Sequence, residues 1–144
     1  MRILKHLIVL FLLSISFVAC NDEGPDGEGP IIEIINIPDN KEYKFGDDLI
    51  MNLKFTDRFG VYEYQYQIYA KEYNPKEFTL SKPIYINFEG YYNERTETQI
   101  IYLPAKSLSE TYYEGDYVIE VKASDINQNV STYYKPIKIV YPTE

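Results

Sequence analysis

Residues 48–56 read DLIMNLKFT, and every second residue from Leu49 to Phe55 is large and apolar. Alternation with a period of two is typical of a half-buried strand in an antiparallel sheet. Two further segments repeat this pattern and are therefore predicted to be strands with one buried face. They are YEYQYQIY at 62–69, with Tyr62, Tyr64, Tyr66 and Ile68 on one face, and YVIEVKA at 117–123, with Tyr117, Ile119, Val121 and Ala123 inward.

The remaining strand candidates are less regular, and turn-forming residues separate them. The candidates are residues 31–37, 84–88, 96–103 and 133–141, and the turns include Phe45-Gly46-Asp47, Arg58-Phe59-Gly60, Glu89-Gly90 and Glu114-Gly115-Asp116. Residues 105–113 are expected to form one or two helical turns, and no helical period extends over a longer segment. About seven short strands predict one all-β domain over residues 31–144, an immunoglobulin-like antiparallel sandwich of the fibronectin III or cadherin type.

The segment that begins at Tyr117 adds two features of such sandwiches. Tyr117 stands at the start of the sixth predicted strand, where its hydroxyl can bond to nearby backbone in a tyrosine corner. The following residues 123–131, ASDINQNVS, resemble the A-x-D-x-x-G-N-x-S hairpin of bacterial Ig-like and cadherin-like modules. Gln128 stands where that pattern has glycine, so Asn129 is expected to supply the left-handed conformation of the turn.

Residues 1–19 predict a secretory signal peptide. Arg2 and Lys5 precede the apolar run LIVLFLL at 7–13, and a small residue stands directly before Cys20. The apolar run is shorter than the about 20 residues of a membrane-spanning helix. FVAC at 17–20 resembles the lipobox of bacterial lipoproteins, whose cysteine is acylated on its thiol before cleavage. The resemblance implies a lipid anchor on Cys20, the single cysteine of the chain; the alternative is an ordinary signal peptide with an incidental cysteine.

Residues 20–30 are predicted to form the lipidated end and a flexible acidic linker. The sequence NDEGPDGEGP at 21–30 has no apolar side chain outside proline, so it cannot bury enough surface to fold and serves as a tether. Asp22-Glu23 resembles the export signal of surface lipoproteins in Bacteroides-type bacteria. This resemblance implies a lipid-anchored protein of the outer membrane, exposed at the cell surface. A plain solvated linker and a protein that faces the periplasm remain the alternatives.

The charge of the mature chain argues against a nucleic-acid partner. The whole chain has 14 Lys and Arg against 22 Asp and Glu; without Arg2 and Lys5 the mature part has 12 against 22, a net charge of −10. Nucleic-acid-binding proteins usually present a basic face. An acidic protein is also not drawn to anionic lipid by charge, so contact with the membrane is expected through the lipid anchor.

Removal of the signal peptide also removes the side chains that most hydrolases need. His6 is the single histidine of the chain, and serine or cysteine hydrolases of the usual kind need an imidazole base. Zinc sites built on His and Cys and intrachain disulfides are excluded in the same way. A carboxylate pair suffices for glycoside hydrolysis, and this stays the least favoured class. We therefore expect no enzyme activity and no cofactor, with calcium as one candidate ligand.

Calcium is the candidate because it takes oxygen ligands from Asp, Asn and backbone carbonyls. Asp125, Asn127 and Asn129 supply such oxygens at alternate positions, as in the Asp-x-Asn loops of cadherin-like modules. Asp57 lies in the loop after the second predicted strand, and this loop can fall at the same end of a sandwich as the loop after the sixth. The alternative, which we favour, is that these side chains form Asx turns within their own loops.

Tyrosine is the other unusual feature, with 16 residues in the chain. Doublets in strands send one ring to each face, so at least one ring of each can be exposed. Exposed tyrosine is favoured at recognition surfaces, and sugar rings also stack on it. The candidate surface for a protein or glycan comprises Tyr91, Tyr92, Tyr112, Tyr113, Tyr133 and Tyr134. The alternative is that these are core and sheet-surface residues, since tyrosine favours strands.

The lipobox, the acidic linker, the turn at 55–57 and the hairpin at 125–131 together resemble Ig-like surface lipoproteins of unknown function from Bacteroides-type bacteria. The resemblance implies a fold and a cellular location, and it implies no known activity. We predict a non-catalytic outer-membrane lipoprotein whose Ig-like domain is a binding or accessory module. The alternative is a structural spacer or a subunit of a surface assembly, such as a fimbria or a glycan-uptake complex. A long, exposed, tyrosine-rich edge strand would favour this alternative through strand addition.

Overall fold

The computed structural model describes residues 27–72, 79–105 and 113–143. Within these ranges the strands are β1 (Ile31–Ile34), β2 (Lys41–Lys44), β3 (Asp48–Ala70), β4 (Thr79–Tyr102), β5 (Gly115–Asp125) and β6 (Val130–Val140). No helix in this part of the chain is long and apolar enough to cross a membrane. The predicted signal peptide, Cys20 and Asp22-Glu23 lie outside the described residues, as do residues 106–112 of the predicted helical turns.

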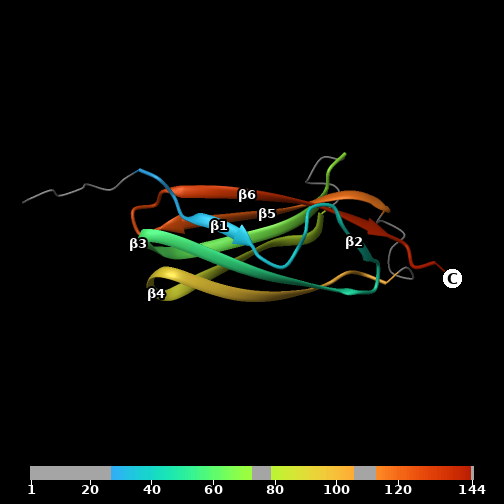
Figure 1. Cartoon of the computed structure of the whole chain (residues 1–144), viewed down its shortest axis with the longest axis horizontal. Coiled ribbons are helices and arrows are strands. Elements are labelled where there is room, and N and C mark those ends of the chain that lie inside the picture. The colour runs from blue at the N-terminus through green and yellow to red at the C-terminus, as the bar shows by residue number, and fades with distance from the viewer. Residues whose placement is uncertain (1–26, 73–78, 106–112, 144) are drawn as a thin grey trace, which may run out of the picture.

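Hydrogen bonding joins the strands in the order β1-β3-β5-β6-β2, and β4 pairs with β3. Neighbouring strands are antiparallel, except that β2 and β6 are parallel. Figure 1 shows β3 and β4 both running to one end of the molecule and turning back there, so each strand contributes to two layers. The smaller layer holds β1, residues 48–56 of β3 and residues 94–102 of β4. The larger layer holds residues 61–70 of β3, residues 79–92 of β4, and β5, β6 and β2.

The turn within β3 depends on Asp57 and Gly60. Gly60 has a φ of 100°, which a residue with a side chain adopts only at a cost. A Cβ on Gly60 would also lie 3.0 Å from the Cβ of Tyr91 in β4. The Asp57 Oδ1 atom accepts hydrogen bonds from the backbone N–H groups of Phe59 (2.7 Å) and Gly60 (2.9 Å). The predicted turn at 58–60 is therefore confirmed, and it is the point where the paired strands fold over.

The core lies between the two layers and is built from the alternate residues that the sequence pattern predicted to point inward. The rings of Phe55 in the smaller layer and Tyr64 in the larger layer approach to 4.7 Å between centroids. Removal of such apolar surface from water is the main stabilising contribution to a sandwich of this kind. The buried residues of these strands include Leu49, Met51, Leu53, Phe55, Tyr64, Tyr66, Ile68, Tyr117, Ile119, Val121 and Ala123.

Tyr62 is the exception, and its predicted inward position is wrong. Its side chain is 38% exposed, and Val61 is buried instead. The register of β3 shifts between Val61 and Glu63 in its pairing with β4 and also in its pairing with β5. An extra residue in a bulge interrupts the alternation of faces. The inward set of the second half of β3 therefore begins at Val61 and resumes at Tyr64.

The predicted strand segments fall within the observed strands almost completely, but two pairs of them are joined. Segments 48–56 and 62–69 are the two halves of β3, and segments 84–88 and 96–103 belong to β4. The strand β2 was missed because its sequence, KEYK, has no run of alternating apolar residues. The strand β2 forms because β6 supplies backbone hydrogen-bond partners for it in a parallel pairing. The local sequence of β2 contains no signal for this pairing. The predicted all-β architecture is confirmed.

Two local predictions at the ends of β5 have different outcomes. Tyr117 forms the predicted tyrosine corner, because its ring is buried and its hydroxyl donates a hydrogen bond to the Tyr113 carbonyl at 2.6 Å. In the hairpin after β5, Gln128 rather than Asn129 is left-handed, with a φ of 68°. Gln128 thus takes the unusual conformation itself, at the position where the similar hairpins have glycine.

Candidate functional site

The outer face of the larger layer presents a row of residues from four neighbouring strands. Gln65 of β3 pairs with Tyr85 of β4 on one side and with Lys122 of β5 on the other. Lys122 pairs in turn with Thr132 of β6. Residues in register on neighbouring strands point to the same face of a sheet and are in contact range. The row therefore brings together side chains from distant parts of the sequence on a surface that faces away from the core.

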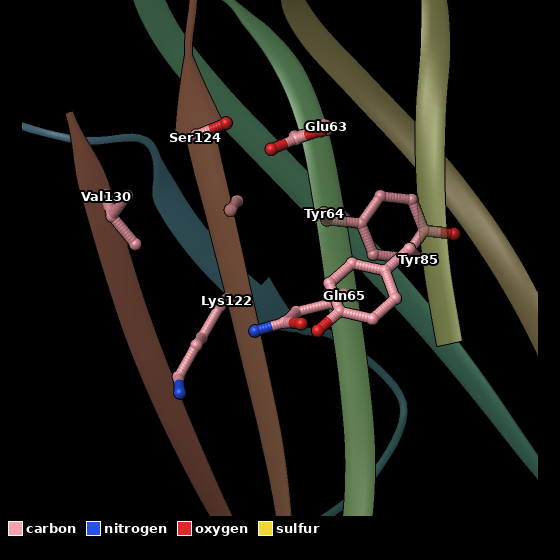
Figure 2. A pocket seen from close by; sticks show the side chains of 8 residues that line it. Glu63, Tyr64, Gln65, Tyr85, Lys122, Ser124 and Val130 are labelled. Carbon is pink, nitrogen blue, oxygen red and sulfur yellow. The ribbon is translucent and has the colours of Figure 1, made fainter. Parts of the chain in front are cut away.

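A groove with a volume of about 120 Å³ lies at this row. Figure 2 shows the Tyr85 ring beside the Gln65 carboxamide, with Lys122 and Val130 on the neighbouring strands. Tyr85 is 74% exposed, so its ring is open to a ligand. The complete lining consists of Glu63, Tyr64, Gln65, Tyr85, Lys122, Ala123, Ser124 and Val130.

Gln65 has an unusual feature within this groove. Its Oε1 atom is buried, and no hydrogen-bond donor of the described residues reaches it. Such an acceptor costs about 1–3 kcal/mol when it is left unsatisfied, and nearly all buried polar atoms of native proteins therefore have a partner. The atom is covered in this conformation, so a ligand donor would remove that cost only after the Gln65 side chain turns into the groove.

Lys122 and Glu120 form a salt bridge next to the groove. The Lys122 Nζ atom lies 2.9 Å from Glu120 Oε1, which also accepts a hydrogen bond from Gln67 Nε2 at 3.0 Å. The Tyr69 hydroxyl donates to the other carboxylate oxygen at 3.5 Å. The hydrogen bond to Glu120 raises the pKa of the Lys122 ammonium group. The Glu120 carboxylate is thus already engaged by Lys122, Gln67 and Tyr69.

A second, smaller hollow of about 80 Å³ lies at the start of β5. Three carboxylates line it, from Glu72, Glu114 and Asp116, and all three side chains are exposed. Glycoside hydrolysis needs two carboxyl groups with different roles, and burial of one of them is the usual way to keep it protonated. The three exposed carboxylates have no such difference in burial, so this hollow provides no argument for catalysis.

The four residues predicted to bind calcium lie in two loops at the same end of the sandwich, as expected. The backbone N–H of Ile126 donates to the Gly60 carbonyl at 3.2 Å and joins the two loops. Asp57 forms the turn already described, and Asp125 is completely buried. Asp125 Oδ1 and Oδ2 accept hydrogen bonds from the backbone N–H and the Nδ2 of Asn129, both at 2.8 Å. Asn127 is exposed.

The carboxylates of Asp57 and Asp125 thus have the turn-forming role that the sequence left open as the alternative to calcium. Among the described residues, no group of three or more His, Cys, Asp or Glu side chains is arranged to hold a metal ion. Asparagine and backbone oxygens are also calcium ligands, so calcium binding at these loops stays a prediction.

The tyrosine doublets are dispersed over the molecule. Tyr91 and Tyr92 are both exposed at the turn of β4, and the Arg95 guanidinium lies over the Tyr92 ring at 4.7 Å. Tyr133 packs against the core, whereas Tyr134 is exposed. Tyr113 is exposed, and Tyr112 lies outside the described residues.

Of these tyrosines, Tyr134 lies nearest in register to the groove, because it pairs with Glu120 on the same outer face. The exposed aromatic residue of the groove is Tyr85, which does not belong to a tyrosine doublet and was not predicted. The alternation in IYINF at 84–88 was the available signal, since Phe88 points inward and Tyr85 therefore outward. No local pattern could have identified Gln65, because its neighbours Tyr85 and Lys122 lie on two other strands.

No family model matches this sequence, and no curated protein matches it. Solved structures do resemble it. The fibronectin(III)-like modules of Clostridium thermocellum CbhA are 13% identical with a TM-score of 0.50, over 79% of this chain and 48% of that chain. The periplasmic chaperone SfaE is 17% identical with a TM-score of 0.52, over 80% of this chain and 58% of that chain.

This chain therefore spans about half the length of the solved proteins that it matches. At such identities the likeness concerns the fold alone. It confirms the predicted fold class, an immunoglobulin-like sandwich of the fibronectin III kind.

Proposed function

We propose that this chain is a lipid-anchored protein of the bacterial outer membrane whose single Ig-like domain is a non-catalytic binding module, exposed at the cell surface. The observation that carries the binding role is the groove at Gln65, where an exposed tyrosine ring lies beside a buried acceptor that no donor of the described residues reaches. A sheet surface that evolved only for solubility has no reason to keep such an acceptor, because its desolvation lowers stability.

Several features support a non-catalytic role. The mature chain has no imidazole, and its one thiol would carry the lipid. In the groove, Lys122 is paired with Glu120, and Glu63 is the single carboxylate of the lining. General acid–base catalysis needs a positioned side chain that can give or take a proton at the reacting group, and glycoside hydrolysis needs two carboxyl groups. The groove offers binding contacts instead.

The stability of a Gln65 variant tests the binding role without knowledge of the ligand. Gln65→Met keeps the length of the side chain and removes the unsatisfied acceptor, so the free energy of unfolding should rise by about 1 kcal/mol in urea titrations. The matched control is Gln99→Met, because Gln99 Nε2 donates to the Tyr64 hydroxyl at 2.7 Å and its loss should lower stability. A fall of more than about 1 kcal/mol for Gln65→Met would make Gln65 a structural residue and overturn the proposal.

The lipid anchor is supported by the lipobox at Cys20, and the last residues of the linker lie against the domain. A Cβ on Gly29 would lie only 2.6 Å from the backbone nitrogen of Ser131, so the end of the linker passes closely over the start of β6. In Figure 1 this is also the end where β3 and β4 turn back.

The anchor is tested by Cys20→Ser. We expect this variant to lose metabolic labelling with a fatty acid and to move from the membrane fraction to the soluble fraction. Protease treatment of intact cells should degrade the wild-type protein if it faces outward, and should spare it if it faces the periplasm. A Cys20→Ser protein that stays in the membrane fraction would contradict lipid anchoring.

A second candidate function, a subunit of a surface assembly, is favoured by the edge of β4. Among the described residues, β4 pairs only with β3 and leaves its other edge unpaired along the strand. The strand contains Tyr85, Tyr91, Tyr92 and Tyr102, and its Ile100 side chain is 66% exposed. Unpaired strand edges are templates for addition of a strand from another chain.

Sedimentation of the mature protein separates this candidate from the first. Assembly through β4 predicts oligomers that grow with concentration and that Ile100→Lys dissolves, because a charge on an edge strand opposes edge-to-edge pairing. The control is Ile31→Lys, which places the same charge at an exposed position on β1. A monomer at high concentration, or equal effects of both variants, would remove the assembly role.

A further inference from the structure

The groove at Gln65 also restricts the class of ligand, an inference that rests on the proposed binding function. Its volume of about 120 Å³ is well below the roughly 300–1,000 Å³ of pockets that enclose a whole drug-sized ligand. The occupant is therefore a single ring or side chain. A single ring makes few contacts, so we expect the ligand to be a polymer. One of its units would occupy the groove and its neighbouring units would lie on the exposed face of the sheet.

The chemistry of the groove requires a ligand with a flat apolar face and a hydrogen-bond donor at its edge. The exposed Tyr85 ring offers the flat surface, and the buried Gln65 Oε1 atom requires an O–H or N–H donor. Figure 2 shows Glu63 and Ser124 at one end of the same groove, with their side-chain oxygens turned toward one another across β3 and β5. A second hydroxyl group on the ring of the ligand would therefore reach the side-chain oxygens of Glu63 and Ser124.

The charges exclude an acidic occupant. Glu63 lines the groove, and the positive charge of Lys122 is compensated by Glu120. The mature chain as a whole has a net charge of −10, so long-range electrostatics repel polyanions. Nucleic acids and acidic polysaccharides therefore do not fit this surface.

We infer that the groove binds one sugar ring of a neutral polysaccharide, with the C–H face of the ring on Tyr85. The Gln65 carboxamide turns into the groove on binding, so that its covered Oε1 atom accepts a hydrogen bond from one hydroxyl of the ring. A pyranose ring combines an apolar face with hydroxyl donors around its edge, which are the two properties that Tyr85 and Gln65 demand. The neighbouring sugar units lie along the outer face of the sheet, where Tyr134 of β6 is the next exposed ring in register.

The experiment is isothermal titration of the mature lipoprotein in detergent. The neutral probes are laminarin, galactomannan, xyloglucan and amylopectin, and the acidic probes are polygalacturonate and alginate. We expect binding of at least one neutral polysaccharide and of neither acidic one. Tyr85→Ala should weaken the neutral ligand at least tenfold, Tyr85→Phe should retain most of the affinity, and Gln65→Met should weaken it several-fold. Tyr102→Ala, at an exposed ring of the smaller layer, is the matched control and should leave the affinity unchanged.

The outcomes separate the ligand class from the binding function. Absence of binding to every neutral probe, or equal losses for Tyr85→Ala and Tyr102→Ala, overturns the sugar assignment. If a peptide selected from a displayed library then binds and is lost in Tyr85→Ala, the groove is a site for protein segments and the binding module stands. If neither class binds, both the sugar assignment and the proposed function of the groove fall.

Discussion

Gln128 has a left-handed backbone conformation at the hairpin position where similar hairpins have glycine. It has a φ of 68°, a region that costs residues other than glycine roughly 1–2 kcal/mol because the Cβ approaches the following carbonyl. The hairpin tolerates this cost because the turn is held from both sides. Asp125 accepts two hydrogen bonds from Asn129, and the Gln128 N–H donates to the Asp125 carbonyl at 3.2 Å.

Gln128→Gly is therefore expected to stabilise the domain by about 1 kcal/mol, since glycine adopts this conformation without the steric cost. The melting temperature should rise by about 4–8 °C for a domain of this size. Asn127→Gly is the control, because Asn127 is not among the residues with positive φ and gains only flexibility. Equal effects of the two substitutions on the melting temperature would show that the backbone conformation is not the reason.

Asp125 is the residue on which the calcium prediction can be tested. Its carboxylate is completely buried and is used by Asn129, so Asp125→Ala should destabilise the domain by about 2–3 kcal/mol. If the carboxylate serves the turn alone, this loss is the same with and without millimolar calcium, and the wild-type melting temperature does not respond to the ion. A rise in wild-type melting temperature with calcium that is absent in Asp125→Ala would instead establish a metal site.

At the scale of the element, β5 is positioned by its first residues. The Tyr117 hydroxyl crosses back to the Tyr113 carbonyl and fixes the entry of the strand. The alternate side chains that follow, from Ile119 to Ala123, then point into the core. The strand β3 relies on a different device, the bulge at Val61 and the turn at Gly60, to place its two halves in different layers.

Tyr117→Phe tests the corner. The substitution keeps the buried ring and leaves the Tyr113 carbonyl without this donor, so stability should fall by about 1 kcal/mol, the usual net value of a hydrogen bond between neutral groups. Chemical denaturation measures the change, with Tyr134→Phe at an exposed ring as the control that should be neutral. An unchanged midpoint for Tyr117→Phe would mean that the corner does not contribute to stability.

At the scale of the whole molecule, the high tyrosine content has an electrostatic consequence. Burial raises the pKa values of the Tyr43, Tyr64, Tyr66 and Tyr69 hydroxyls above their ordinary value. The folded protein thus keeps phenolic protons that the unfolded chain releases above about pH 10. Because the raised pKa belongs to the folded state, the stabilisation is complete below about pH 10 and is lost as the pH rises further.

The free energy of unfolding should therefore fall above about pH 10, by about 1.4 kcal/mol per pH unit for each tyrosine that stays protonated. Tyr64→Phe should reduce this slope by about 1.4 kcal/mol per pH unit, which is the contribution of one proton. Urea titrations between pH 8 and pH 11 measure the slope, and Tyr85→Phe at the exposed groove tyrosine serves as the control. A slope that Tyr64→Phe does not change would contradict the role of burial.

Much of the fold could be predicted because burial of one sheet face imposes a pattern on nearest neighbours in sequence. Leu49, Phe55, Ile119 and Val121 were all predicted inward and are buried. The misses have a common cause in long-range pairing. The bulge that exposes Tyr62 arises where β3 pairs with β4 and β5 together, and β2 exists because β6 lies beside it.

The sequence by itself determined the two-layered β architecture and the acidic character of the chain, with 14 Lys and Arg against 22 Asp and Glu. These follow from local periodicity and from composition, which need no three-dimensional information. The tertiary structure alone decided which tyrosines are exposed and which buried acceptor lacks a donor among the described residues. Tyr85, Gln65 and Lys122 meet only because three strands pair in one register, and exposure and hydrogen-bond satisfaction are properties of such contacts between residues far apart in the chain.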